Sequence, residues 1–93
     1  MEKEAVIVSC VRTAIGKQGG ALASMPAHLY GAEVIKEAIK RANITADMAE
    51  DCIMGNVLSG GGNIARLTAL QTHLSLELPG VTVDRQCGSG INA

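Results

Sequence analysis

Aromatic residues are nearly absent from this chain. Tyr30 is the only aromatic residue among 93, and the chain contains no Phe and no Trp. This lack excludes the aromatic stacking platforms on which single-stranded nucleic acids bind. The formal net charge of −1 also leaves no basic surface for nucleic acid and no polybasic membrane anchor.

Charged residues and long hydrophobic runs are also scarce. Charged residues make up 18% of the chain and hydrophobic residues 47%, whereas charged residues reach ~25% in typical soluble domains. This composition excludes intrinsic disorder, and it indicates that something else covers much of the surface. The apolar run over residues 5–11 is far shorter than the ~20 residues that span a bilayer. Since no signal-peptide pattern precedes it, we expect a cytoplasmic chain.

The cysteines are too few and too far apart for a disulfide scaffold or a zinc site. Cys10, Cys52 and Cys87 form no CxxC pair, and their odd number leaves a thiol that is free or pairs with another chain. We therefore expect no metal. Cys10 lies within one predicted strand and Cys52 opens another, which favours small core residues at both positions.

Segments typical of strands and helices alternate along the chain. The predicted strands are residues 5–11, 51–58 and 81–86. Between the first two, residues 26–43 carry apolar side chains at 3- and 4-residue spacing, which predicts an amphipathic helix that Asn43 ends. Residues 45–50 are predicted as a short capped turn. The alternation indicates βαβ crossovers and a parallel α/β sheet.

A second helix is predicted to begin after Asn63, a good N-cap residue. Its expected apolar contacts are Ala65, Leu67, Leu70 and Leu74. A third helix is predicted to begin near Ile91 and would extend only about one turn. Because a three-stranded parallel sheet of this size has open edges and uncovered faces, we expect residues 1–93 to be the N-terminal portion of a larger domain, either cut or completed by another chain.

Cys87 lies where a predicted strand leads into a Gly-rich turn and a helix. Ligands of open α/β sheets gather at the carboxyl ends of strands, and backbone N–H groups at a helix start stabilise a thiolate or an oxyanion. Gly88 and Gly90 permit a tight turn. This context is typical of a nucleophile elbow with sulfur in place of oxygen. A buried structural cysteine beside a loop is the alternative, and position alone does not decide between them.

Four blocks of this sequence resemble the thiolase family. Residues 12–20 (RTAIGKQGG) resemble its RTPxGxxGG segment, and residues 54–58 (MGNVL) match its MGNVL strand end. Residues 63–66 (NIAR) resemble its NPAR helix start, and residues 87–90 (CGSG) resemble the element that carries the thiolase nucleophile. Their order and spacing also resemble those of the family. Ala14 and Ile64 stand where the family often has proline, which affects loop stiffness rather than chemistry.

The resemblance implies the start of a mixed five-stranded layered sheet, in a βαβαβα order, that this chain leaves incomplete. It implies acyl transfer between coenzyme A thioesters, by condensation of two acetyl-CoA or by thiolysis of 3-ketoacyl-CoA, with no bound cofactor. Cys87 would hold the acyl group, and its backbone N–H would donate to the oxyanion. Gly88, Ser89 and Gly90 would form the supporting loop. The complete protein would be a homodimer or homotetramer.

The family also uses a histidine in a GHP motif, a second cysteine in a CxG motif and an asparagine in an NEAF motif. None of these motifs occurs in the 93 residues. The alternative is therefore a non-catalytic fragment or interaction subunit that requires a partner chain to complete the fold. A ketoacyl synthase shares acyl-cysteine chemistry, but its cysteine context does not resemble the CGSG element.

Several other polar residues are candidates for a role at the site. Asn56 and Arg66 could orient the catalytic loop or a subunit contact, although structural roles are favoured for both. His28 and His73 are interpreted as solvated or capping residues rather than as activators of Cys87. The glycines of residues 59–62 lack the pattern of a phosphate-binding loop, so a plain loop is expected. Residues 84–86 are polar for a central strand, and the resemblance suggests that they form contact surface.

Overall fold

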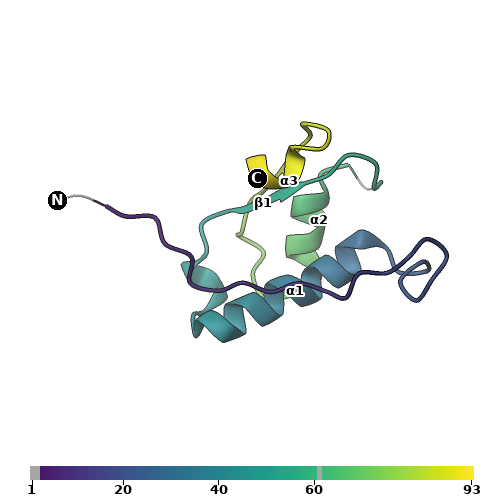
Figure 1. Cartoon of the computed structure of the whole chain (residues 1–93). Helices are drawn as coiled ribbons and strands as arrows, with labels where there is room; N and C mark the ends of the chain where they lie inside the picture. The colour runs from purple at the N-terminus through teal and green to yellow at the C-terminus, as the bar shows by residue number, and fades with distance from the viewer. Residues whose placement is uncertain (1–2, 61) are drawn as a thin grey trace.

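The structure, a computed structural model, describes residues 3–60 and 62–93. The elements in chain order are α1 (Ala27–Ala42), a 3-10 turn η1 (Ala46–Met48), β1 (Cys52–Gly55), α2 (Ile64–Gln71), β2 (Gly80–Val83) and α3 (Ser89–Asn92). β1 and β2 pair in parallel, with Cys52 opposite Gly80 and Gly55 opposite Val83. Since α2 connects them, β1, α2 and β2 form one βαβ unit, with α1 packed below it in Figure 1.

Helix α1 confirms the predicted amphipathic helix and its end. Two ion pairs, Glu33–Lys36 at 2.7 Å and Glu37–Arg41 at 2.8 Å, lie on its solvent side. The hydrogen bond from Arg41 lowers the pKa of Glu37. Asn43 ends the helix in the left-handed conformation (φ 56°), and its backbone N–H donates to the last carbonyl groups of the helix.

Helix α2 begins as predicted but ends earlier. The Asn63 side chain caps it by accepting a hydrogen bond from the Arg66 backbone N–H at 3.2 Å. The helix stops at Gln71, so the expectation that it includes Leu74 is wrong, and Leu74 is 47% exposed. His73 adopts a left-handed conformation (φ 57°) just after the helix, and this conformation turns the chain away from the helix axis.

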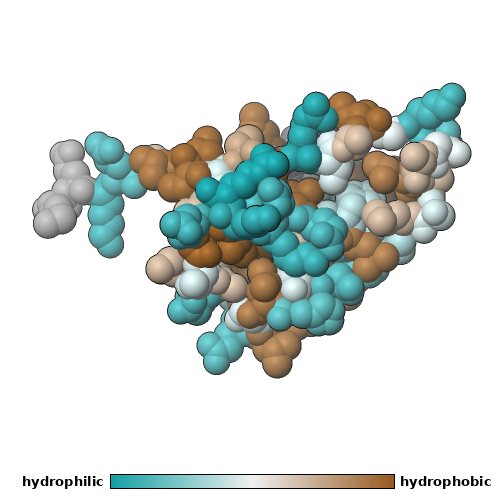
Figure 2. All heavy atoms as spheres, turned by 90° about the horizontal axis from the view of Figure 1, so that it is seen from below, coloured by the Kyte–Doolittle hydropathy of each residue, from teal (hydrophilic) through white to brown (hydrophobic). Residues whose placement is uncertain are grey.

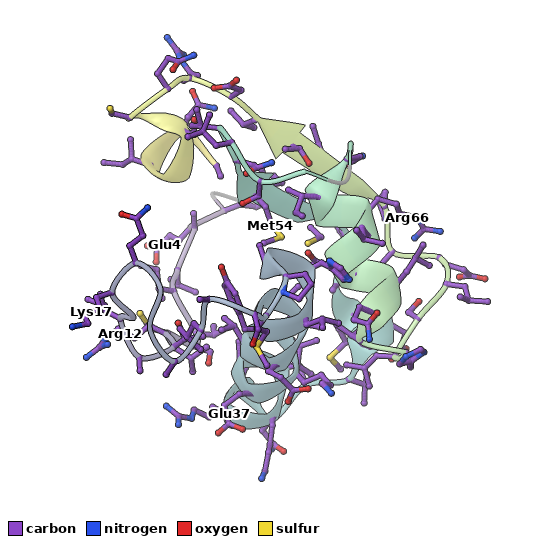
Figure 3. The ribbon with its side chains drawn as sticks, turned by 90° about the vertical axis from the view of Figure 1, so that its right-hand side faces the viewer. Glu4, Arg12, Lys17, Glu37, Met54 and Arg66 are labelled. Atoms are coloured by element: carbon purple, nitrogen blue, oxygen red, sulfur yellow. The ribbon has the colours of Figure 1, made fainter. Side chains whose placement is uncertain are left out.

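The core lies between the helices and the covered face of the two strands. It consists of Cys52, Ala65, Ala69 and Leu78, with partly buried side chains packed around it from Ile35, Ala49 and Met54. Figure 3 shows Met54 pointing from the sheet toward α1. Because most of these core side chains are small, α2 approaches both α1 and the strands closely.

The two paired strands are shorter than predicted, for a local reason at each end. Asn56 stops β1 because its side chain both donates to the Ser59 carbonyl (2.7 Å) and accepts from the Ser59 N–H (3.1 Å). Asp84 stops β2 because its carboxylate accepts the Gln86 N–H at 3.0 Å. Such side-chain bonds to nearby backbone compete with a strand ladder.

The predicted first strand, residues 5–11, is wrong for this structure. The segment runs as extended chain without strand pairing, and residues 6–9 line a hollow together with Ala38, Ile39 and Ala42 of α1. Only its N-terminal end projects from the rest of the chain in Figure 1. Val6, Ile7 and Val8 are 70%, 89% and 67% exposed, and the apolar atoms beside the grey terminus are visible in Figure 2. Within the described residues the sheet therefore has two strands, not three. A strand requires a neighbour for its backbone groups, and here β1 and β2 pair only with each other.

Candidate active site

Cys87 lies in the turn that connects β2 to α3, and it is exposed. The Gly88 N–H donates to the Arg85 carbonyl at 3.0 Å, and the Ser89 N–H donates to the Gln86 carbonyl at 3.1 Å. Gln86, the residue before the cysteine, has a positive φ of 51°. A bulky residue in this region is strained and persists only where surrounding contacts hold it.

Ser89 makes two further hydrogen bonds within this turn. Its hydroxyl accepts the Arg85 N–H at 2.7 Å and donates to the Gln86 carbonyl at 2.7 Å. The residue is only 4% exposed. The Arg85 guanidinium in turn donates to the Asn92 side chain at 3.0 Å. These contacts hold the chain on both sides of the strained residue.

Gly55, at the end of β1, lies directly against the same turn. A Cβ added at Gly55 would stand 2.6 Å from the Ser89 carbonyl carbon and 2.7 Å from the Gly90 nitrogen. Such distances exclude any side chain at this position. The sequence interpretation missed this contact, although a glycine inside a strand pattern is a known sign of close backbone approach.

The two polar groups of Cys87 that matter for acyl transfer are its thiol and its backbone N–H. Among the hydrogen bonds of residues 3–60 and 62–93, none uses this N–H or the Cys87 sulfur. An exposed thiol beside an unbonded N–H is a combination that suits attack on a carbonyl carbon and stabilisation of the resulting oxyanion.

Asn56 and Arg66 contact other parts of the chain. Asn56 holds the loop after β1 through Ser59. The Arg66 guanidinium donates to the Leu76 carbonyl at 2.9 Å and also to the Leu78 carbonyl, both in the loop between α2 and β2. Figure 3 shows Arg66 pointing toward that loop. These hydrogen bonds agree with structural roles, and a role for either residue in orienting the catalytic turn stays a prediction.

The remaining cysteines differ from Cys87 and from each other. Cys52 is buried and its sulfur donates to the Ala65 carbonyl at 3.7 Å, which confirms the expected core residue. Burial, and to a lesser extent the nearby Asp51 carboxylate, raises the pKa of the Cys52 thiol. Cys10 is exposed, so its assignment to the core is wrong. The reason is that its segment has no strand partner.

The other candidates carry no visible site. His28 lies in the first turn of α1 and lines a hollow of about 360 Å³ together with Ser59 and Gly60. His73 is exposed just after α2. The predicted plain loop at residues 59–62 lies partly outside the described residues, at position 61. In the described part of the chain no cluster of three metal-ligating side chains occurs, and no helix there is long and apolar enough to cross a membrane.

Sequence relatives of this chain differ greatly in length. It is 46% identical to an acetyl-CoA acetyltransferase of Clostridioides difficile, with 98% of this chain and 87% of that protein covered. It is 48% identical to an acetyl-CoA acetyltransferase of Escherichia coli, again with 98% of this chain covered. In that case the chain spans only 24% of the relative's length.

Solved structures and a family model match the same region. The Acat5 thiolase from Ascaris suum in complex with coenzyme A superposes with a TM-score of 0.87 at 38% identity, covering 94% of this chain and 23% of that one. The Bacillus anthracis acetyl-CoA acetyltransferase gives a TM-score of 0.85 at 35% identity, covering 95% and 23%. The model of the thiolase N-terminal domain matches residues 5–93. The chain therefore belongs to the thiolase family, and residues 5–93 match its N-terminal domain.

Proposed function

We propose that this chain carries the nucleophile of an acyl-CoA acyltransferase of the thiolase type. One observation carries the proposal: Cys87 exposes its thiol at the carboxyl end of a parallel strand, with its own backbone N–H unbonded. Relatives named as acetyl-CoA acetyltransferases, and a similar thiolase that holds coenzyme A, support acyl-CoA as the substrate class.

The first half-reaction would form an acyl-cysteine. The Cys87 sulfur, as thiolate, attacks the thioester carbonyl carbon of an acyl-CoA. A sulfur–carbon bond forms, the bond to the CoA sulfur breaks, and the departing CoA thiolate takes up the proton that Cys87 lost. The backbone N–H of Cys87 donates to the oxyanion of the tetrahedral intermediate.

The second half-reaction would release Cys87 by forming a carbon–carbon bond. A base removes an α-proton from a second acyl-CoA, and the resulting carbanion attacks the acyl carbonyl, so that the Cys87 thiolate leaves. In reverse, CoA cleaves a 3-ketoacyl-CoA. The resemblance places the α-proton base in family motifs that these 93 residues lack, so the chain by itself is expected not to thiolyse acetoacetyl-CoA.

Mass spectrometry of the intact protein after brief incubation with acetyl-CoA tests the first half-reaction. The purified chain, with any polypeptide that copurifies, is expected to gain one acetyl group that maps to Cys87. Cys87→Ser abolishes this increment, whereas Cys10→Ala and Cys52→Ala retain it. Equal loss in all three variants contradicts the assignment of Cys87.

A second candidate function, an interaction subunit completed by a partner chain, is favoured by the uncovered apolar surface. Ile53 and Val81 are opposite each other on the free face of the sheet, 47% and 43% exposed. The exposed residues 6–8, beside α1, are a separate apolar patch, and both patches suit a polypeptide that supplies the rest of a thiolase fold. For such an assembly we expect a particle larger than 9.6 kDa in solution. We expect the same for a homodimer or homotetramer that has residues 84–86 in its interface. A monomeric chain without acetylation would leave neither function standing.

A further inference from the structure

The turn before Cys87 contains a strained residue that lies outside the helices and strands. Gln86 has a φ of 51°, and it lies between the end of β2 and the start of α3. It carries a long side chain rather than glycine, so this backbone conformation has an energetic cost that neighbouring contacts must offset.

The Asp84 carboxylate bonds to one backbone group of this turn, the Gln86 N–H, at 3.0 Å. The Ser89 hydroxyl bonds to two. It accepts the N–H of Arg85, on one side of Gln86, and donates to the carbonyl of Gln86 itself, both at 2.7 Å. The Gln86 carbonyl also accepts the Ser89 backbone N–H at 3.1 Å. One residue therefore makes three hydrogen bonds to the two residues that precede the cysteine.

Burial makes these bonds difficult for water to replace. Ser89 is 4% exposed, and its backbone packs against β1 at Gly55, where even a methyl group would not fit. A hydroxyl that is buried and uses both its donor and its acceptor stabilises one conformation strongly, because the alternatives leave polar groups unsatisfied.

We propose that Ser89 is a positioning residue for Cys87: its hydroxyl holds Gln86 in the left-handed conformation that places the thiol and leaves the Cys87 N–H unbonded. The inference rests on the proposed role of Cys87 as nucleophile. Ser89 acts through the backbone of Arg85 and Gln86 and does not touch the substrate.

The test compares Ser89→Ala with Ser75→Ala in the full chain. Ser75 also forms one side-chain hydrogen bond, with the Glu77 N–H at 3.2 Å, but it lies in the loop before β2. Two quantities are measured: the HN–Hα coupling of Gln86 by NMR, which reports φ, and the rate at which acetyl-CoA acylates Cys87.

Ser89→Ala is expected to remove the left-handed coupling of Gln86 and to lower the maximal acylation rate about tenfold, since small misplacements of a reacting group have large effects. The final amount of acetyl-cysteine and the half-saturating acetyl-CoA concentration change less than about twofold, whereas simple unfolding would lower the amount. Ser89→Thr, which keeps the hydroxyl, restores both readouts, and Ser75→Ala changes neither.

A Gln86 coupling that survives in Ser89→Ala overturns the inference, and so does a lost coupling with an unchanged acylation rate. Failure of the proposed function has a different signature. If the parent chain is not acylated at Cys87, the nucleophile assignment fails, while the coupling of Gln86 still decides whether Ser89 holds the turn.

Discussion

The βαβ unit and the N-terminal segment share a composition but not a structure. Residues 5–11 are as rich in β-branched and apolar side chains as β1 and β2, yet Ile7 is 89% exposed whereas Leu78, next to β2, is 8% exposed. These two regions show that β-propensity describes a fit to a neighbouring surface rather than an intrinsic backbone preference. β1 and β2 have that neighbour in each other and in α2, whereas the N-terminal segment has no strand partner and lies only beside α1.

Truncating one apolar side chain in each region gives the largest expected contrast. Leu78→Ala is expected to lower the free energy of unfolding by about 2–5 kcal/mol, because it leaves a cavity in the core. Ile7→Ala changes it by less than about 0.5 kcal/mol. Urea unfolding measures both. A large loss for Ile7→Ala would mean that a partner or a second copy covers the N-terminal segment in solution.

Adding one methyl group beside the Cys87 turn tests how closely β1 packs against α3. Gly55→Ala is expected to lower the free energy of unfolding by about 1–3 kcal/mol, since its Cβ would overlap the Ser89 backbone. Gly60→Ala is the matched control because nothing lies within 4 Å of its Cβ. Similar thermal midpoints for the two variants would contradict the close approach of β1 and α3.

The cysteines of the two regions give the smallest effect, at alkaline pH. Burial raises the pKa of Cys52 in the folded chain above its ordinary value of 9.0, so the unfolded chain loses this proton first. The stability contributed by the neutral thiol is complete below the unfolded-state pKa. It is lost as the pH rises through the higher folded-state pKa. Chemical denaturation between pH 8 and pH 11 measures this. Cys52→Ala removes that part of the decline and Cys10→Ala retains it; the same decline in both variants would contradict the burial of Cys52.

Much of the local structure could be predicted from particular residues. The amphipathic spacing of residues 27–42 and the caps at Asn43 and Asn63 are local signals, and the structure confirms them. The Gly-rich turn at Cys87 was also readable, because strand, glycine and helix signals are adjacent there. The early ends of β1 and β2 were missed because Asn56 and Asp84 bind nearby backbone, which the apolar pattern does not reveal.

Residue types and their spacing were enough to predict the family, the order of helices and strands from residue 27 onward, and the Gly-rich turn that contains Cys87. These depend on residue type and spacing along the chain. The structure was needed to show that residues 5–11 lack strand pairing, that Gly55 lies against Ser89, and that Gln86 has a positive φ. The physical reason is that pairing, close approach and strain each depend on which backbone lies alongside, and that neighbour comes from elsewhere in the fold.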